Sequence, residues 1–281
     1  MRILVTGANG YLGRGIVRQL LDRGYETAAA DFRMESVDER ADQFAGDIFC
    51  IHDPYETFGR PDVLLHLAWR DGFAHYADSH IQDLPKHYAF LKAFAASGIK
   101  SIAVMGSMHE VGPYEGQITE STPCCPVTPY GISKNALREL TRNLCRKNGK
   151  AFLWLRAFYI VGNDPRGSSL FSKVALAAGE GKMEFPFTSG RNRFDFTDYQ
   201  PFCEMAGAAV VQSDVTGIIH LCSGKPEKLA NRTERFIREN GYGIRLQYGA
   251  FPDRPYDSQA VWGDSGKIRE ILNRQKAEED A

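Results

Sequence analysis

The chain has 281 residues and a formal net charge of -1; 43% of the residues are hydrophobic and 25% are charged. This length fits one large core or two lobes, and the composition is that of an ordinary soluble globular protein. The near-zero charge gives no electrostatic case for a nucleic acid or an anionic membrane as partner.

The sequence lacks the features of an exported or metal-binding protein. Its six cysteines are scattered without a Cys-x-x-Cys pair, which indicates reduced thiols and predicts no metal site. No apolar stretch approaches the roughly 20 residues of a membrane span. The first apolar run breaks at once into glycine instead of continuing as a signal peptide. We therefore expect a cytoplasmic protein without a membrane partner.

The chain begins with a short apolar strand and a glycine-rich turn. Residues 3–5 predict a buried strand, residues 6–10 a turn, and a helix follows from about Tyr11. Glycines in such a turn let a pyrophosphate approach the helix N-terminus, where the macrodipole favours negative charge. The residues expected to contact a dinucleotide here are Gly7, Asn9, Gly10, Tyr11, Leu12 and Gly13.

An acidic residue follows the turn at the distance that a dinucleotide site requires. The first helix should end at Gly24, and a second strand over residues 25–30 leads to Asp31. A carboxylate about twenty positions after the turn can accept hydrogen bonds from both hydroxyls of an adenosine ribose, which favours NAD. Arg33 could instead pair with a 2′-phosphate, so NADP stays open.

Apolar strands then alternate with helices. Strands are expected at residues 62–68, 100–106 and 152–156, and helices at residues 81–96 and 130–146. Near-continuous apolar strands separated by helices predict a parallel sheet covered on both faces. Ligands of such sheets bind at the carboxyl ends of the strands.

The fold class predicted from this pattern is α/β, with a Rossmann-like doubly wound parallel sheet and a smaller C-terminal α/β lobe. After Gly162 the periodic pieces become shorter, and residues 216–222 read as one more strand of the main sheet. We assign residues 1–162 and 206–224 to a dinucleotide-binding domain. Residues 163–205 and 225–281 are assigned to a substrate-binding lobe.

The catalytic prediction rests on the stretch Tyr130-Gly-Ile-Ser-Lys134. A spacing of four places the phenol and the ammonium on one helix face, and a nearby cation lowers the pKa of a tyrosine toward useful acid/base work. Ser107 ends the preceding strand, where its hydroxyl can hold a substrate oxygen. Each residue alone also fits a structural role, but the three together, downstream of a dinucleotide turn, favour catalysis.

In these motifs the sequence resembles the extended short-chain dehydrogenase/reductase family, in its NAD-dependent epimerase/dehydratase group that modifies sugar nucleotides. Thr6 to Gly13 matches the glycine signature of the family, and Tyr130 to Lys134 matches its Tyr-x-x-x-Lys. Gly46-Asp47-Ile48 resembles the element that contacts the adenine, and His66-Leu67-Ala68 resembles the strand beside the nicotinamide ribose. Later stretches also match, at residues 219–226, 254–257 and 263–268.

The resemblance implies a mechanism. Tyr130, paired with Lys134, moves a proton at a sugar hydroxyl or carbonyl while hydride passes between that carbon, commonly C4, and the nicotinamide. Ser107 holds the oxygen, and Lys134 also binds the nicotinamide ribose. Arg193 and Arg254 would neutralise the pyrophosphate of the sugar nucleotide. Members of the family commonly pair as homodimers through two helices, which here would be residues 81–96 and 130–146.

Departures from the family pattern narrow the activity. The Asp-Glu pair of the dehydratases is replaced by Met108 and His109, which disfavours dehydration. His109 occupies a place where some relatives keep a second acid/base group, so it is a candidate proton donor, with a packed loop histidine as the alternative. Tyr159 stands where an Asn usually contacts the substrate, and Trp69 stands where a small residue is usual.

The leading functional hypothesis is an NAD(P)-dependent oxidoreductase that interconverts a 4-keto-6-deoxy nucleotide sugar and its 4-hydroxy form. The alternative is an NAD-dependent nucleotide-sugar 4-epimerase that uses the same residues. A non-catalytic dinucleotide-binding regulator is the third reading.

Overall fold

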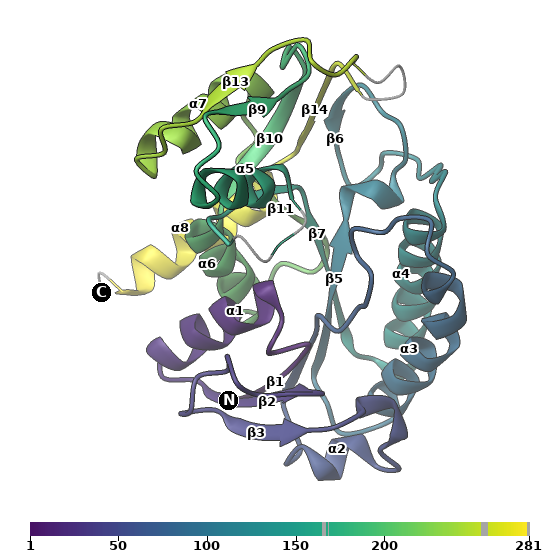
Figure 1. The fold of residues 1–281 in the computed structure, drawn as a ribbon. Coiled ribbons are helices and arrows are strands. Elements are labelled where there is room, and N and C mark those ends of the chain that lie inside the picture. The colour runs from purple at the N-terminus through teal and green to yellow at the C-terminus, as the bar shows by residue number, and fades with distance from the viewer. Residues whose placement is uncertain (165–166, 168, 254–257, 280–281) are drawn as a thin grey trace.

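A computed structural model describes residues 1–164, 167, 169–253 and 258–279. Its main sheet has seven parallel strands in the order β11-β7-β5-β4-β1-β2-β3 (Figure 1). The strands are β1 (Arg2–Thr6), β2 (Glu26–Asp31), β3 (Asp42–Ala45), β4 (Val63–His66), β5 (Ser101–Ser107), β7 (Ala151–Ala157) and β11 (Gly217–Leu221). The chain order reverses beside β1, so the carboxyl ends of β1 and β4 form the crevice where such sheets bind dinucleotides.

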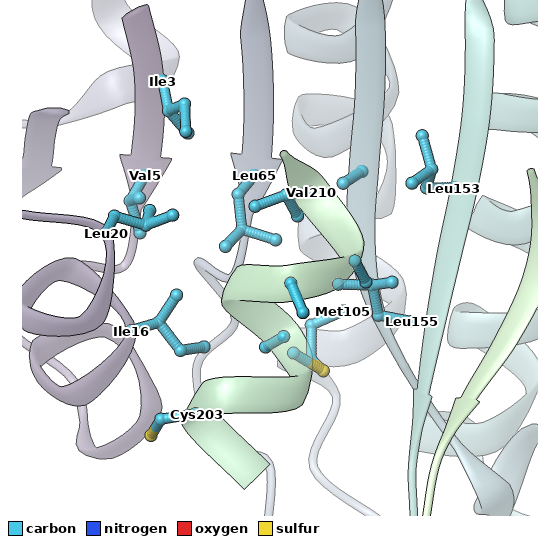
Figure 2. Packing of buried hydrophobic residues seen from close by; sticks show 14 of the residues in the cluster. Ile3, Val5, Ile16, Leu20, Leu65, Met105, Leu153, Leu155, Cys203 and Val210 are labelled. Carbon is cyan, nitrogen blue, oxygen red and sulfur yellow. The ribbon is translucent and has the colours of Figure 1, made fainter. Parts of the chain in front are cut away.

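Helices cover both faces of this sheet. α1 (Tyr11–Asp22), α6 (Tyr199–Val210) and α8 (Gly266–Glu279) pack on one face, and α3 (Ser79–Ala95) and α4 (Pro129–Asn148) pack on the other. Figure 2 shows side chains of the first core, among them Ile3, Val5, Ile16, Leu20, Leu65, Met105, Leu155, Cys203 and Val210. The predicted doubly wound α/β fold is therefore confirmed.

The sequence located the central strands and one edge strand of the main sheet, and it missed the other edge strand. The strands and helices expected up to residue 156 are present within a few residues, and the strand expected at 216–222 is β11. β3 was not predicted because this edge strand is mostly exposed and carries no apolar run. α6 and α8 lie in the part of the chain where the periodicity looked short, although both pack against the main sheet.

A smaller sheet lies beyond the carboxyl ends of β5 and β7 (Figure 1). Its path is β12 (Pro226–Lys228), β10 (Arg193–Asp198), β14 (Ala260–Gly263) and β6 (Gly116–Ile118), with β8 (Tyr159–Val161) paired to β10. α5 (Leu170–Gly179), α7 (Leu229–Glu239) and the pair β9 (Glu184–Pro186) and β13 (Arg245–Gln247) complete this region. Short helices α2 (Pro54–Thr57), η1 (Ile48–Cys50) and η2 (Met108–Glu110) connect the strands.

Two strands and two helices pack differently from the domain ranges expected from the sequence. β6 and β8 fall inside the range assigned to the dinucleotide-binding domain, but they hydrogen-bond into the smaller sheet. Each of these two strands follows a long strand of the main sheet, because the chain continues past the carboxyl edge of that sheet into the smaller one. α6 begins at Tyr199 and α8 begins at Gly266, both inside the ranges assigned to the substrate lobe, yet both helices pack on the main sheet.

A buried carboxylate joins the strands of the smaller sheet to the main one. Asp195 on β10 is fully buried and accepts hydrogen bonds from the backbone N–H of Ser223 at 2.9 Å, Gly224 at 2.9 Å and Gly263 at 3.2 Å. These donors come from the turn after β11 and from β14. A buried charge needs such partners, so this residue holds three distant segments in one arrangement. No helix in the described ranges is long and apolar enough to span a membrane.

The outer strand of the main sheet buries a histidine against an arginine. His220 on β11 lies in register with Arg156 on β7, and the two side chains approach at 3.2 Å between Nε2 and Nη1. Because Arg156 donates, Nε2 of His220 accepts and the imidazole is neutral. Burial and the Arg156 charge lower the pKa of His220 from 6.5 to about 4.

This histidine makes stability fall on acidification. Below pH 6.5 His220 takes up a proton in the unfolded chain, whereas in the folded chain it stays neutral until about pH 4. The free energy of unfolding therefore drops by about 1.4 kcal/mol per pH unit in that window. His220→Gln keeps the acceptor but cannot titrate, so urea denaturation between pH 4.5 and 6.5 should show a slope smaller by about one proton. His52→Gln, at an exposed position, should keep the wild-type slope. An unchanged slope in His220→Gln would contradict the assignment.

Candidate active site

The glycine turn brings three backbones together. Gly7 has φ of 71°, and a Cβ there would lie 2.7 Å from the backbone N of Ala68. A Cβ at Gly13 would overlap the Gly7 carbonyl. At Gly10 a Cβ would meet only that carbonyl, at 3.1 Å, among the described atoms. Gly7 and Gly13 are thus required by packing, and Gly10 is the position whose open side suits the approach of a pyrophosphate.

A cavity of about 290 Å³ opens at the carboxyl ends of β1, β2 and β4. Asp31 lies in its wall, where Oδ2 accepts the Asn9 N–H at 3.0 Å and Oδ1 accepts the Phe32 N–H at 2.7 Å. Carboxylate oxygens keep further lone pairs for ribose hydroxyls. The lining residues are Gly7, Ala30, Asp31, Phe32, Gly46, Asp47, Ile48, Phe49, Ala68, Trp69, Arg70, Asp83, Lys86 and His87. Five of the predicted cofactor residues therefore share one cavity, and its donors and acceptors suit an adenosine.

The remaining residues predicted around the turn have structural contacts. Asn9 accepts the Ser36 N–H at 2.8 Å through Oδ1. The Tyr11 ring packs on Tyr199 at 4.5 Å between centroids. Leu12 and Leu67 pack against the core. Their predicted cofactor contacts stay predictions, carried by their place beside the cavity.

Arg33 bears on the choice between NAD and NADP. Its side chain is 80% exposed and forms an ion pair with Glu35 at 3.5 Å. It does not line the cavity. The charged side chain that reaches the cavity at the end of β2 is that of Asp31, whose charge repels a 2′-phosphate. The geometry therefore favours NAD.

Ser107 and Tyr130 meet at the far side of the crevice. β5 ends at Ser107, and α4 starts one residue before Tyr130. Burial raises the pKa of Tyr130 to about 12, and the nearby Ser107 hydroxyl opposes this shift. The sequence predicted a lowered tyrosine pKa, and this was wrong because burial dominates.

Lys134 does not donate to the tyrosine. Its ammonium donates to the Met105 carbonyl at 2.9 Å and lies 3.9 Å from the centroid of the Trp69 ring. Burial lowers the pKa of Lys134 to about 7, and the charge of Glu110 opposes this shift. The spacing did place Lys134 and Tyr130 on one helix, but the fold directs the ammonium toward the carboxyl end of β5.

Four aromatic rings surround Tyr130, and two of these residues were not predicted from the sequence. Trp69, His75, His80 and His109 approach its ring at centroid distances of 6.2, 5.0, 5.2 and 6.0 Å. His75 stacks on it with an interplanar angle of 8°. The histidines at 75 and 80 follow the His66–Ala68 strand closely, but no spacing rule predicts that they would meet the tyrosine. Together the rings restrict the rotation of Tyr130.

His109 lies beside the catalytic pair but does not suit the predicted role. Its backbone N–H donates to Ser107 Oγ at 3.3 Å, and its ring lies 4.4 Å from that of His75. Burial lowers the pKa of His109 to about 4, with a further contribution from His75. The imidazole is therefore neutral at pH 7, which disfavours His109 as a proton donor.

Glu110 holds Ser107 in place, a role that was not predicted from the sequence. Its Oε1 accepts the Ser107 backbone N–H at 2.8 Å and the Trp154 indole N–H at 2.8 Å. Arg138 and Arg156 balance its buried charge, each at 3.4 Å. The signal was present in the Ser-x-x-Glu spacing, which forms a capping box. The Glu110 side chain is fully buried, so its role is to hold Ser107.

Two of the predicted substrate residues, Tyr159 and Arg193, lie in the smaller sheet, whereas Ser107 ends β5 of the main sheet. Tyr159 stacks on Phe194 with centroids 4.4 Å apart. Arg193, at the start of β10, is exposed and donates to the Pro226 carbonyl at 3.2 Å. Arg254 lies outside the described residues. Across those that are described, no cluster of three or more His, Cys, Asp or Glu is arranged to hold a metal.

Comparisons with known proteins identify the family of the chain. The model of the NAD dependent epimerase/dehydratase family matches residues 3–240. A dTDP-6-deoxy-L-talose 4-dehydrogenase (NAD(+)) from Aggregatibacter actinomycetemcomitans is 41% identical over 94% of this chain and 99% of its own length. UDP-arabinose 4-epimerase 1 from Arabidopsis thaliana is 24% identical over 96% of this chain and 74% of its own.

A solved structure extends the likeness in fold. The UDP-glucose 4-epimerase of Thermotoga maritima, crystallised with UDP-glucose, superposes with a TM-score of 0.81 at 20% identity. The alignment covers 96% of this chain and 92% of that one. With the glycine turn, the acidic strand end and the Ser-Tyr-Lys set brought to one crevice, the chain belongs to the NAD-dependent epimerase/dehydratase family of extended short-chain dehydrogenases/reductases.

Proposed function

We propose that the protein is an oxidoreductase that interconverts a 4-keto-6-deoxy nucleotide sugar and its 4-hydroxy form by hydride transfer at C4, with NAD as cofactor. The observation that carries the proposal is the 41% identity, over nearly the whole of both chains, to the dTDP-6-deoxy-L-talose 4-dehydrogenase. The reaction is alcohol plus NAD⁺ to ketone, NADH and a proton, so atoms and electrons balance.

The cavity side of the crevice fits the cofactor. Asp31 would accept hydrogen bonds from the ribose hydroxyls of the cofactor, and Gly10 would leave room for its pyrophosphate at the start of α1. NAD, when bound, supplies the nicotinamide ring that exchanges hydride with C4. An NADP preference is disfavoured because Arg33 points to Glu35 and Asp31 lines the cavity.

Residues on the far side of the crevice carry out the proton transfer. With a pKa of about 12, Tyr130 carries its proton at neutral pH, which is the state that a general acid needs when a ketone is reduced. Ser107 holds the C4 oxygen through its hydroxyl, which Glu110 orients through the backbone. In the oxidation direction Tyr130 must first lose its proton, and Lys134 supplies the positive charge that favours this.

A 4-epimerase remains the second candidate, since UDP-arabinose 4-epimerase 1 is 24% identical over most of this chain. An epimerase returns the hydride to the opposite face of the sugar and keeps its NAD. It therefore shows no net change in nicotinamide.

Stoichiometry separates the two candidates. Purified protein incubated with dTDP-6-deoxy-L-talose and NAD⁺ should form one NADH per sugar oxidised, measured by nicotinamide absorbance and by mass spectrometry of the sugar. With the corresponding 4-keto sugar and NADH as reactants, the reaction should run in the reverse direction. Inversion of the 4-hydroxyl without NADH formation would establish the epimerase instead.

Tyr130→Phe tests the proton step. Removing the hydroxyl should lower kcat by roughly 10²- to 10⁴-fold because general acid–base catalysis contributes that much. NAD affinity, measured by calorimetry, should stay within about threefold because the ring keeps its place. Tyr76→Phe, at a tyrosine that is 75% exposed, is the matched control and should retain wild-type turnover. Undiminished kcat in Tyr130→Phe would remove this residue from the mechanism.

We also propose a homodimer paired through α3 and α4. These helices lie side by side (Figure 1) and expose Ile81, Ile132 and Leu140. Sedimentation equilibrium should give about twice the chain mass of 31.4 kDa, and Leu140→Glu should shift it toward the monomer by burying a charge. Leu176→Glu, on the exposed side of α5, should leave the mass unchanged. A monomer at micromolar wild-type protein would refute the pairing.

A further inference from the structure

Trp69 touches the cofactor cavity and both residues of the catalytic pair. It follows β4 directly and lines the same cavity as Asp31. One side of the indole meets the Lys134 ammonium, 3.9 Å from a ring centroid, and its edge faces Tyr130 at 6.2 Å.

The indole offers Lys134 an electrostatic partner where solvent is excluded. Burial alone penalises the charged form of this lysine. The negative face of an indole attracts a cation, and more strongly once both are desolvated. The Met105 carbonyl supplies the one hydrogen bond to Nζ that the structure shows, at 2.9 Å. Ring and carbonyl together hold the ammonium.

Hydrogen bonds and stacking hold the indole itself. Its N–H donates to His80 Nδ1 at 3.1 Å, and His80 Nε2 meets the Ala74 carbonyl at 3.0 Å. This arrangement needs the His80 tautomer with its proton on Nε2. The indole also stacks on His87 at 4.6 Å with an angle of 17°. His87 in turn is tied at 2.8 Å to His66.

We propose that Trp69 is a positioning residue that holds the Lys134 ammonium, charged and in place, between the cofactor cavity and Tyr130. The role in turnover rests on the proposed function, whereas the hold on the ammonium does not. Other groups also act on Lys134: Glu110 from η2 favours its charge, and the neutral imidazoles of His66 on β4 and His87 on α3 lie close enough to feel it.

The titration of Lys134 tests this directly. The ¹³Cε resonance of lysine-labelled protein, assigned with Lys134→Met, reports the pKa of the ammonium without any substrate. Trp69→Leu removes the ring face and should lower the Lys134 pKa by about one unit. Trp69→Phe keeps an aromatic face and should shift it by less than half as much. The high-pH limb of kcat should move to lower pH by the same amounts, because the ammonium is lost earlier.

Fluorinated tryptophan inserted at position 69 separates electrostatics from packing. Each added fluorine weakens the negative face with little change in shape, so the Lys134 pKa should fall stepwise while the melting temperature stays nearly constant. The fluorinated series also tests the proposal if the Trp69→Leu variant does not fold. Trp262→Phe on β14 is the matched control and should leave the Lys134 titration unchanged.

The proposal fails if Lys134 titrates alike across the fluorinated series, or if Trp69→Phe shifts it as far as Trp69→Leu. Either result would make Trp69 a packing residue. If no nucleotide sugar is turned over but the stepwise shift is observed, the proposed function fails and the role of Trp69 stands.

Discussion

The contact of backbone on backbone at the glycine turn is the constraint on which the rest of the site depends. Gly7 lies so close to Ala68 that a Cβ would stand 2.7 Å from its nitrogen, and Gly13 brings α1 equally close to the turn. These contacts lock β1, α1 and β4 together. Asp31 and Trp69, from different strand ends, therefore line one cavity.

Burial at this crevice decides the chemistry of the titratable groups. Tyr130 keeps its proton at neutral pH, and Lys134, with a pKa of about 7, holds its charge only weakly. The interior disfavours charge on both, and only specific partners oppose that cost. The Ser107 hydroxyl opposes the pKa shift of the phenol, and the Trp69 indole and the Met105 carbonyl contact the ammonium. An active site arranged in this way is sensitive to small changes in its surrounding rings.

The fold accounts for the cofactor but not for the outcome of the reaction. A 4-dehydrogenase and several 4-epimerases resemble this chain over nearly its whole length. Both reactions need a hydride acceptor beside C4 and one acid/base group at its oxygen. They differ in whether the sugar turns before hydride returns. The shared architecture by itself does not decide between these two outcomes.

The sequence by itself determined the doubly wound sheet, the dinucleotide turn, Asp31 and the Ser107, Tyr130 and Lys134 set, because each is encoded in local spacing or apolar runs. The Ser-x-x-Glu spacing of Ser107 and Glu110 also encodes the capping box that the structure shows. Only the tertiary structure decided that Gly7 and Gly13 serve packing, that the lysine lies on Trp69, and that histidines surround the tyrosine. These depend on burial and on contacts between segments far apart in the chain, which exist only once the parallel sheet has brought its carboxyl edges together.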